Sequence, residues 1–411
     1  MLAAGPPPLR TVVVVSTTEN RTLNRRTVLG GVLATLAIAA CGSSGTKAGE
    51  STTTAAAGSA TTAGATATTA AGTATTAGST ATTAKAATDL KATLNASGAT
   101  FPKAFYGEAI ASFAERYKGV TINYGGGGSG KGRQDLADQI VDWAGSDGVI
   151  PDADKAKFKG GDVLYFPTVV APITISYNLD GVDKLQLSPD TIAKIFQLRI
   201  KSWDDAAIAA DNLGVKLPAT PIVVAVRSDS SGTTDNFTKF VDRASGDAGS
   251  KVWTLKNGSK VEWPAGVQAG EGNGGVAKLV GDNKGGIGYV DLSDALAAKL
   301  KTASVKNQSG KFVAPTLDAA SAAAEGAEIK ADLTFSLPWA KGDAAYPITA
   351  QTWIIVYKTQ TDKAKGAATT EFIRWILTDG QKLAKDVNFA ALPTSLSAKA
   401  LAQLDMIVLP A

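Results

Sequence analysis

A segment of unusual composition limits how much of this chain can form a folded body. From Gly42 to Thr88 almost every residue is Ala, Thr, Gly or Ser, and the unit Ala-Thr-Thr-Ala recurs at 60, 67, 74 and 81. This seven-residue repeat contains no large apolar side chain that a coiled coil would bury. We therefore predict a flexible linker over 42–88, with a root-mean-square reach of about 35 to 40 Å. The globular part must be built from residues 89–411.

The residues before this linker have the pattern of an export signal. Arg25 and Arg26 precede a thirteen-residue apolar run, 28–40, that is too short to span a bilayer and is followed by Cys41. The pattern resembles a bacterial lipoprotein signal, in which the cysteine after a small apolar triplet is cleaved and acylated. It implies a signal peptide over 1–41 and a lipid anchor at Cys41, on the outer face of the cytoplasmic membrane. The alternative is a buried free cysteine.

The composition excludes several classes of site. The 411 residues include no histidine and one cysteine, which excludes Ser-His-Asp and Cys-His nucleophiles, histidine-ligated zinc and disulfides. The formal net charge is +4, but six basic and two acidic residues precede Asp89. The chain from Asp89 onward therefore carries equal numbers of each sign, and nucleic-acid binding through a broad basic face gains no support.

The stretch Arg227–Thr234 indicates a strand, a turn and the start of a helix. An apolar run at 222–226 precedes it, and Phe237, Phe240 and Val241 follow at helical spacing. We predict that the helix begins at 231–233. A helix start offers unpaired N–H groups and the positive end of the helix dipole, and an arginine stands beside it, so the stretch suits a tetrahedral oxyanion. The alternative is an ordinary Ser/Thr cap next to a surface arginine.

Two further turns of this kind occur earlier in the chain. Ser97–Pro102 precedes a predicted helix whose apolar face repeats every fourth residue, at Phe105, Ala109, Phe113 and Tyr117. Gly125–Gly132 follows a short predicted strand at 120–124. Behind it, Leu136, Ile140 and Trp143 predict one face of a helix.

The glycine run at 125–132 partly fits a nucleotide-binding loop. Gly125, Gly130 and Lys131 have the Walker A spacing, but Gly132 occupies the position where that motif needs Ser or Thr for magnesium. We therefore favour an anion site in which consecutive glycines let backbone N–H groups approach the ligand closely.

Asp147 ends the segment Gly145-Ser146-Asp147, just past the predicted helix. A carboxylate near an anion site is usually a solvated surface acid. The functional alternative is that Asp147 accepts a hydrogen bond from a proton on the ligand. Such an acceptor selects phosphate, which keeps at least one proton at neutral pH, over sulfate, which keeps none.

Taken together, these turns resemble a known family. In order and spacing, the chain over nearly all of 95–395 is similar to the phosphate-binding proteins of bacterial ABC transporters. The similarity is carried by four anion-site blocks: Gly98–Pro102, Gly128-Ser129, Gly145–Asp147 and Arg227–Thr233. Supporting blocks are 166–168, 201–205, 285–290 and 346–349.

The resemblance implies a set of phosphate-binding residues and a role for each. The set is Thr100, Phe101, Ser129, Asp147, Arg227, Ser231, Gly232 and Thr233. Asp147 would accept a hydrogen bond from the ligand proton, Arg227 would supply a charged fork, and the others would donate hydrogen bonds. Asp229 would orient Arg227 from behind. Lys131 stands where many members of the family have a small residue, and we expect it to point to solvent.

The resemblance also implies the fold. It predicts an α/β, two-lobed periplasmic-binding-protein-like fold of type II, with lobes joined by a two-strand hinge. The first lobe would comprise 89–170 and 349–411, and the second 171–348. The hinge crossings are expected near 169–171 and 348–352. Short apolar strands at 164–177, 222–226 and 353–357, alternating with helical patterns, agree with this class.

The implied function is capture of inorganic phosphate between the lobes and delivery to an ABC permease. The permease and its ATPase would be separate chains, and the protein would be a monomer without catalytic activity, cofactor or metal. Two alternatives stay open. One is a secreted phosphatase with a Ser or Asp nucleophile, and the other is a binding protein for another oxyanion such as sulfate.

Overall fold

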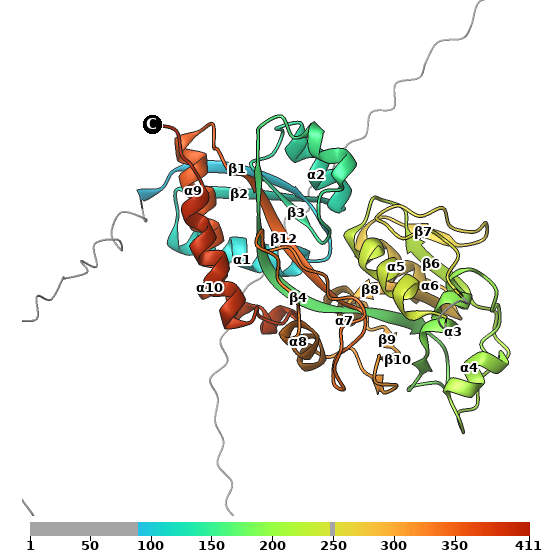
Figure 1. Cartoon of the computed structure of the whole chain (residues 1–411). Coiled ribbons are helices and arrows are strands. Elements are labelled where there is room, and N and C mark those ends of the chain that lie inside the picture. The colour runs from blue at the N-terminus through green and yellow to red at the C-terminus, as the bar shows by residue number, and fades with distance from the viewer. Residues whose placement is uncertain (1–88, 247–250) are drawn as a thin grey trace, which may run out of the picture. The chain divides into compact units, whose positions relative to one another are not determined.

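The structure, a computed structural model, describes residues 89–246 and 251–411 (Figure 1). The signal peptide predicted over 1–41, the acylation predicted at Cys41 and the linker predicted over 42–88 all lie outside these ranges. All described residues belong to one compact unit, Gly78–Ala411. Within the described ranges, no helix is long and apolar enough to cross a membrane.

One sheet runs through this unit, with strands in the order β2-β1-β3-β12-β4-β8-β6-β7 and with β9 paired to β4. Its two halves carry different helices, and we call them the first and second lobes. In the first lobe, β1 is parallel to β2 and β3, while β12 is antiparallel to β3 and β4. Its strands are β1 (Ala92–Gly98), β2 (Val120–Gly127), β3 (Trp143–Ser146), β12 (Thr349–Tyr357) and the 163–172 part of β4 (Val163–Asn178). Its helices are α1 (Lys103–Arg116), α2 (Ser129–Ala137), α9 (Lys363–Leu377) and α10 (Thr394–Gln403), with short 3-10 turns at Asp152–Lys157, Asp379–Leu383, Lys385–Val387 and Leu404–Met406.

In the second lobe, the 173–178 part of β4 pairs antiparallel with β8, and β6 is parallel to β8 and β7. A small separate sheet has the order β11-β10-β5. The strands are β5 (Gln186–Leu187), β6 (Val223–Arg227), β7 (Gln268–Gly270), β8 (Gly286–Asp291), β9 (Lys301–Thr302), β10 (Ser304–Lys306) and β11 (Phe312–Val313). The helices are α3 (Pro189–Phe196), α4 (Ala206–Asp211), α5 (Gly232–Ala244), α6 (Gly272–Asp282), α7 (Leu292–Ala297) and α8 (Leu317–Glu325).

Strand β4 belongs to both lobes. Its residues 163–172 pair with β12, and from Ile173 onward the same strand pairs with β8. The chain returns to the first lobe at the start of β12, where Thr349 pairs with Pro172. Two adjacent antiparallel strands therefore run through the region where the two lobes meet.

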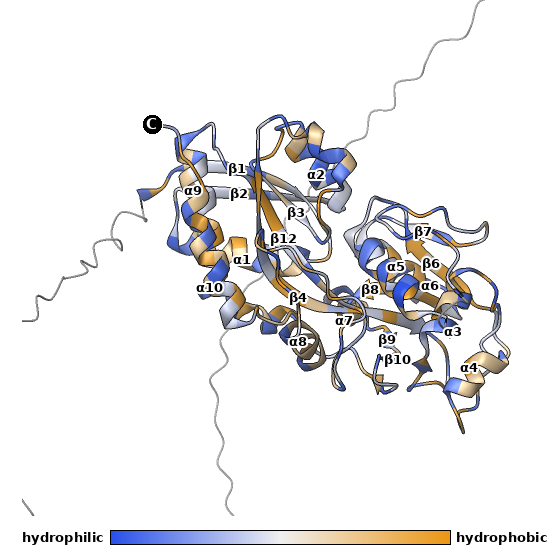
Figure 2. Ribbon diagram, in the orientation of Figure 1, coloured by the Kyte–Doolittle hydropathy of each residue, from blue (hydrophilic) through white to orange (hydrophobic). Residues whose placement is uncertain are grey.

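The predicted apolar faces are confirmed as core. Phe105, Ala109, Phe113 and Tyr117 are all buried, and Phe113 stacks on Tyr117 with ring centroids 4.3 Å apart. On α5, Phe237, Phe240 and Val241 are fully buried. Figure 2 shows hydrophobic residues along β12 and β6, as expected for strands covered on both faces.

The predicted helix face through Leu136, Ile140 and Trp143 is wrong. Helix α2 ends at Ala137, Gln139 adopts a left-handed φ of 59°, and Ile140 is 65% exposed. Trp143 begins β3, a four-residue strand that lies between β1 and β12. A fully buried strand this short shows no alternation, so apolar spacing alone does not distinguish it from helix. The position of Asp147 after a helix was therefore also predicted wrongly, because it follows the strand β3.

Candidate functional site

The candidate site lies where strands of both lobes end and helices begin. The turn after β1 carries Thr100 and Phe101, α2 starts at Ser129, and Asp147 directly follows β3. In the second lobe, β6 ends at Arg227 and α5 starts at Gly232. Because the carboxyl ends of neighbouring parallel strands share one edge of a sheet, each lobe brings its polar turns together at one edge.

Arg227 is fixed within the second lobe. Its side chain is 1% exposed, and it donates from Nε to Asp229 Oδ1 at 2.8 Å and from Nη2 to Asp229 Oδ2 at 2.5 Å. Nη1 also reaches Thr233 Oγ1 at 3.3 Å. Burial alone would raise the pKa of Asp229, but the hydrogen bonds and charge of Arg227 outweigh it and hold that pKa below its ordinary value. The guanidinium is therefore held in one orientation.

The start of α5 combines a helix cap with free donors. Ser231 Oγ accepts a hydrogen bond from the N–H of Thr234 at 3.0 Å, as an N-cap should. The hydroxyl proton of Ser231 stays available for a ligand. Among the described residues, the N–H groups of Gly232 and Thr233 have no hydrogen-bond partner, because they belong to the first turn of the helix. The cap and the anion-site interpretations of this stretch are thus compatible.

Asp147 is the central polar group of the first lobe. Its carboxylate accepts from Thr352 Oγ1 at 2.7 Å and from Ser129 Oγ at 3.3 Å, and its side chain has almost no contact with solvent. Burial raises the pKa of Asp147 to about 7, although these hydroxyls and the charges of Arg227 and Arg133 act to lower it. Asp147 is therefore a buried carboxyl group that titrates near neutral pH.

The two groups of residues touch across the lobes. A Cβ added at Gly232 would lie 2.3 Å from Ser129 Oγ and 2.6 Å from Asp147 Oδ2, so α5 packs directly on the first lobe. Asn273 also connects the lobes, because its Nδ2 donates to Thr100 Oγ1 at 3.2 Å and to Thr233 Oγ1 at 3.1 Å. The lobes are closed on one another at this site.

The structure thus brings the predicted residues into one connected cluster. The aromatic ring of Phe101 is an exception, because it packs in the core against Phe389 with ring centroids 5.7 Å apart and leaves only its backbone at the site. The N–H of Phe101 has no partner among the described residues. A surface cavity of about 530 Å³ between Ile150, Tyr165 and Met406 contains none of these residues.

Lys131 does not point into the cluster. Its Nζ pairs with Asp135 Oδ2 at 2.5 Å, and its side chain is 54% exposed. It lies in the first turn of α2, which already begins at Ser129. No group of three or more His, Cys, Asp or Glu residues suited to a metal ion occurs within 89–246 and 251–411.

Several residues at the site were not found from the sequence. Asn273 follows Gly272, which has a φ of 67°, at the start of α6, so a further glycine-rich strand-turn-helix was the available signal. Asn236, Gln351 and Thr352 had no such signal. Thr352 and Gln351 lie on β12, and both bind Asp147: the former binds its carboxylate and the latter its backbone carbonyl.

Comparison with known proteins places the chain first in a broad class. The family model described as PBP superfamily domain matches residues 81–380. A high-affinity periplasmic phosphate-binding protein, solved with bound phosphate, has the same fold with a TM-score of 0.64. It is 23% identical, and the match covers 76% of this chain and 94% of that chain. The class is therefore that of two-lobed, periplasmic-binding-protein-like α/β proteins, as the family resemblance implied.

More similar relatives define the family. Phosphate-binding protein PstS of Xylella fastidiosa is 35% identical over 294 residues, covering 70% of this chain and 79% of the relative. Phosphate-binding protein PstS 3 of Mycobacterium leprae is 34% identical over 322 residues, covering 75% and 85%. This chain belongs to the PstS family of phosphate-binding proteins.

Proposed function

We propose that this protein captures inorganic phosphate between its lobes and delivers it to an ABC permease. The observation that carries the proposal is the convergence of hydrogen-bond donors from both lobes around a single buried acceptor. Arg227 and the start of α5 come from the second lobe, and Ser129 with the turn at Thr100 comes from the first. The acceptor is Asp147, and the names of the relatives supply the ligand.

Each residue has a role that its surroundings support. Arg227, oriented by Asp229, offers Nη1 and Nη2 to the phosphate oxygens. Ser231, Gly232 and Thr233 donate from the helix start, while Ser129, Thr100 and the N–H of Phe101 donate from the first lobe. Asp147 accepts a hydrogen bond from the proton that phosphate retains.

The energetics allow binding to drive closure. A hydrogen bond to a charged group contributes about 1.5 to 3 kcal/mol. Micromolar affinity requires only about 8 kcal/mol in total, so several such bonds leave a surplus that offsets desolvation and stabilises the closed form. No covalent step is needed.

We further propose a lobe boundary just before the change of strand pairing, with 89–170 and 349–411 as the first lobe and 171–348 as the second. The hinge would lie near 169–171 and 348–352. The change of β4 from pairing with β12 to pairing with β8 near Ile173 supports this division, because bending there moves one lobe against the other. Opening at the permease would then release the phosphate.

The export route and the partners complete the proposal. The protein would be a monomer, exported and held on the outer face of the cytoplasmic membrane by a lipid at Cys41, with the linker over 42–88 as a tether. Its permease and ATPase are separate chains. Mass spectrometry of the mature N-terminus tests the anchor. A mature chain that begins before position 41 and carries no lipid would contradict acylation at Cys41.

Calorimetric titration tests the ligand. Wild-type protein should bind phosphate tightly and sulfate weakly, and Asp147→Asn should reduce this preference, because the amide can donate to sulfate. Equal binding of both anions by the wild type would show that Asp147 does not select the ligand. Steady turnover of a chromogenic phosphate ester, with or without divalent metals, would instead favour the hydrolase alternative.

A further inference from the structure

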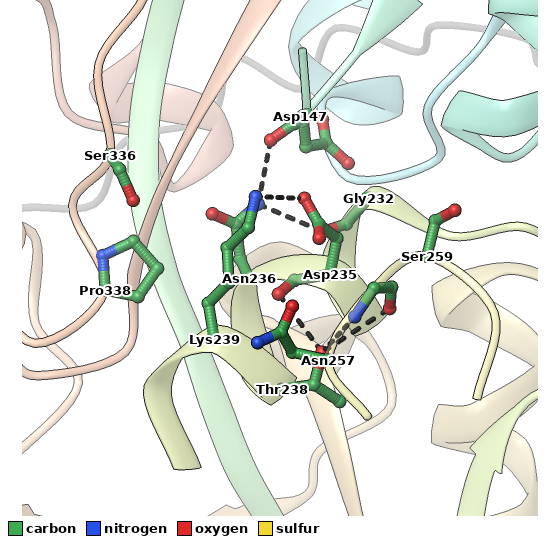
Figure 3. Close-up of polar contacts among 12 residues, drawn as sticks. Asp147, Gly232, Asp235, Asn236, Thr238, Lys239, Asn257, Ser259, Ser336 and Pro338 are labelled. Atoms are coloured by element: carbon green, nitrogen blue, oxygen red, sulfur yellow. Dashed lines mark hydrogen bonds and ion pairs between the residues drawn. The ribbon is translucent and has the colours of Figure 1, made fainter. Parts of the chain in front are cut away.

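Asn236 connects the two lobes beside the site through the backbone carbonyls of Asp147 and Gly232 (Figure 3). It lies one turn into α5, and its Nδ2 donates to Gly232 O in its own helix at 2.9 Å. The same amide group donates to Asp147 O in the first lobe at 2.8 Å. One buried NH₂ group therefore sets the distance between the helix start and the residue that carries the central carboxylate.

Gln351 holds Asn236 from the strand β12. Its Nε2 donates to Asn236 Oδ1 at 3.1 Å and to Asp147 O at 3.2 Å, and its Oε1 accepts from the N–H of Leu337 at 3.1 Å. Gln351 pairs in register with Val170 of β4, in the region where the two strands run between the lobes. Its reach to Asn236 therefore depends on how β4 and β12 are bent.

Both amides are fully paired in the closed arrangement that the structure shows. The two side chains are buried, and every polar atom of each has a partner. When the lobes separate, Asn236 moves away from Asp147 and Gln351, so its bonds to both must break. A buried amide that loses its partners is costly until water replaces them, and this cost resists the first stage of opening.

We propose that Asn236 and Gln351 form a latch that keeps the lobes closed over the bound anion and slows its release. The latch rests on the proposed function, since it acts on the same cleft. Both are positioning residues: they hold the Asp147 backbone against the start of α5, and they bind no ligand atom. An anion must therefore associate before the latch forms and dissociate after it breaks.

The test measures association and dissociation rates of phosphate by stopped-flow fluorescence. Asn236→Ala should raise the dissociation rate about tenfold, which corresponds to about 1.4 kcal/mol, and should leave the association rate within about twofold. Gln351→Ala should act in the same direction. The double variant should resemble the single ones, because the two side chains act as one unit.

Asn212→Ala is the matched control. Asn212 is equally buried, and it binds Gln186 O at 2.7 Å and Ile208 O at 2.8 Å, all within the second lobe. It should lose thermal stability and keep the wild-type dissociation rate. The latch is overturned if Asn212→Ala raises the dissociation rate as much as Asn236→Ala, or if Asn236→Ala changes only the association rate.

An interlobe distance separates failure of the latch from failure of the proposed function. Donor and acceptor dyes on cysteines introduced at the exposed positions Glu108 of α1 and Ala210 of α4, in a chain carrying Cys41→Ser, report opening by energy transfer. Without any anion, Asn236→Ala should lower the transfer efficiency relative to wild type. A wild type that binds no phosphate refutes the proposed function, and unchanged transfer in Asn236→Ala then refutes the latch independently.

Discussion

Arg227 and Asp147 lie at similar places in their lobes, but in the part of the chain that the structure describes only Arg227 has a partner of opposite charge in its own lobe. Arg227 ends β6 and Asp147 follows β3, and each is buried beside the start of a Ser/Gly-rich helix. Arg227 has a carboxylate partner in its own lobe, Asp229, bound through two hydrogen bonds. Among the described residues, the carboxylate of Asp147 accepts only from hydroxyl groups, and burial raises its pKa to about 7. The second lobe therefore offers a permanently charged and oriented group, whereas the first lobe offers one whose charge depends on pH and on the ligand.

The largest expected effect comes from removing Arg227, the group with a partner of opposite charge. Arg227→Ala deletes the charged fork and leaves Asp229 buried without its cationic partner. Breaking a buried ion pair in this way lowers the free energy of unfolding by about 3 to 5 kcal/mol. Phosphate affinity, measured by calorimetry, should fall at least about a hundredfold. Arg116→Ala is the control, because Arg116 pairs with Asp379 at the exposed surface, where such pairs contribute about 0 to 1 kcal/mol. Similar losses in both variants would mean that Arg227 has no special place in the site.

Replacing Asp147, which has no partner of opposite charge in the described part of its own lobe, should raise the stability of the fold, whereas replacing Arg227 lowers it. Burial raises the pKa of Asp147 from its ordinary value of about 4 to about 7, so the folded protein binds a proton at this carboxyl group more tightly than the unfolded chain does. Stability is then lost as pH rises from about 4 to about 7. Asp147→Asn should stabilise the ligand-free protein by up to about 4 kcal/mol at pH 8 and by little at pH 4. Urea unfolding without phosphate measures this difference, and a destabilised variant at pH 8 would contradict it.

The contact between the two lobes is tested at Gly232. A methyl group there meets Ser129 and Asp147 across the lobes, so Gly232→Ala must push them apart. Overpacking of this kind costs about 1 to 3 kcal/mol, and it should appear as weaker phosphate binding, by roughly 5- to 150-fold. Gly107→Ala in α1 is the control, since nothing lies within 4 Å of its added methyl group and helix propensity favours alanine. Unchanged affinity in Gly232→Ala would show that the site binds phosphate without this close approach.

The titration of Asp147 should also appear in its choice of anion. Protonated Asp147 can donate to sulfate, and its fraction increases as pH falls through about 7. Sulfate affinity should therefore rise about tenfold between pH 8 and pH 6, in proportion to the competent fraction. Calorimetric titrations of wild type and Asp147→Asn at both pH values measure it. A rise of equal size in the variant would assign the effect to another group.

The smallest effect is expected at Lys131. Its ammonium is paired with Asp135 and half exposed, so Lys131→Ala should change phosphate affinity by no more than about 1 kcal/mol. The same titration decides this. A larger loss would mean that the lysine contributes charge to the site.

Local patterns explain which features could be predicted from the sequence. The strand before Arg227 and the helix after Ser231 were predictable, because an apolar run, a Ser cap and helical spacing coincide within a few residues. Strand β3 was missed since four buried residues carry no periodicity. Asn236 and Gln351 are isolated amides 115 positions apart, and only the closed fold brings them together. Side chains whose role depends on a distant partner leave no signal in one sequence.

The place of β12 in the sheet has a consequence for how the protein is made. This strand lies between β3 and β4, although nearly all of the second lobe is synthesised before it. Until Thr349–Tyr357 emerges, β3 and the 163–172 part of β4 each have an unpaired edge, which is open to pairing with other chains. The first lobe cannot be completed during most of translation. A nascent chain of this kind therefore keeps its first lobe incomplete until residues 349–357 are available for pairing.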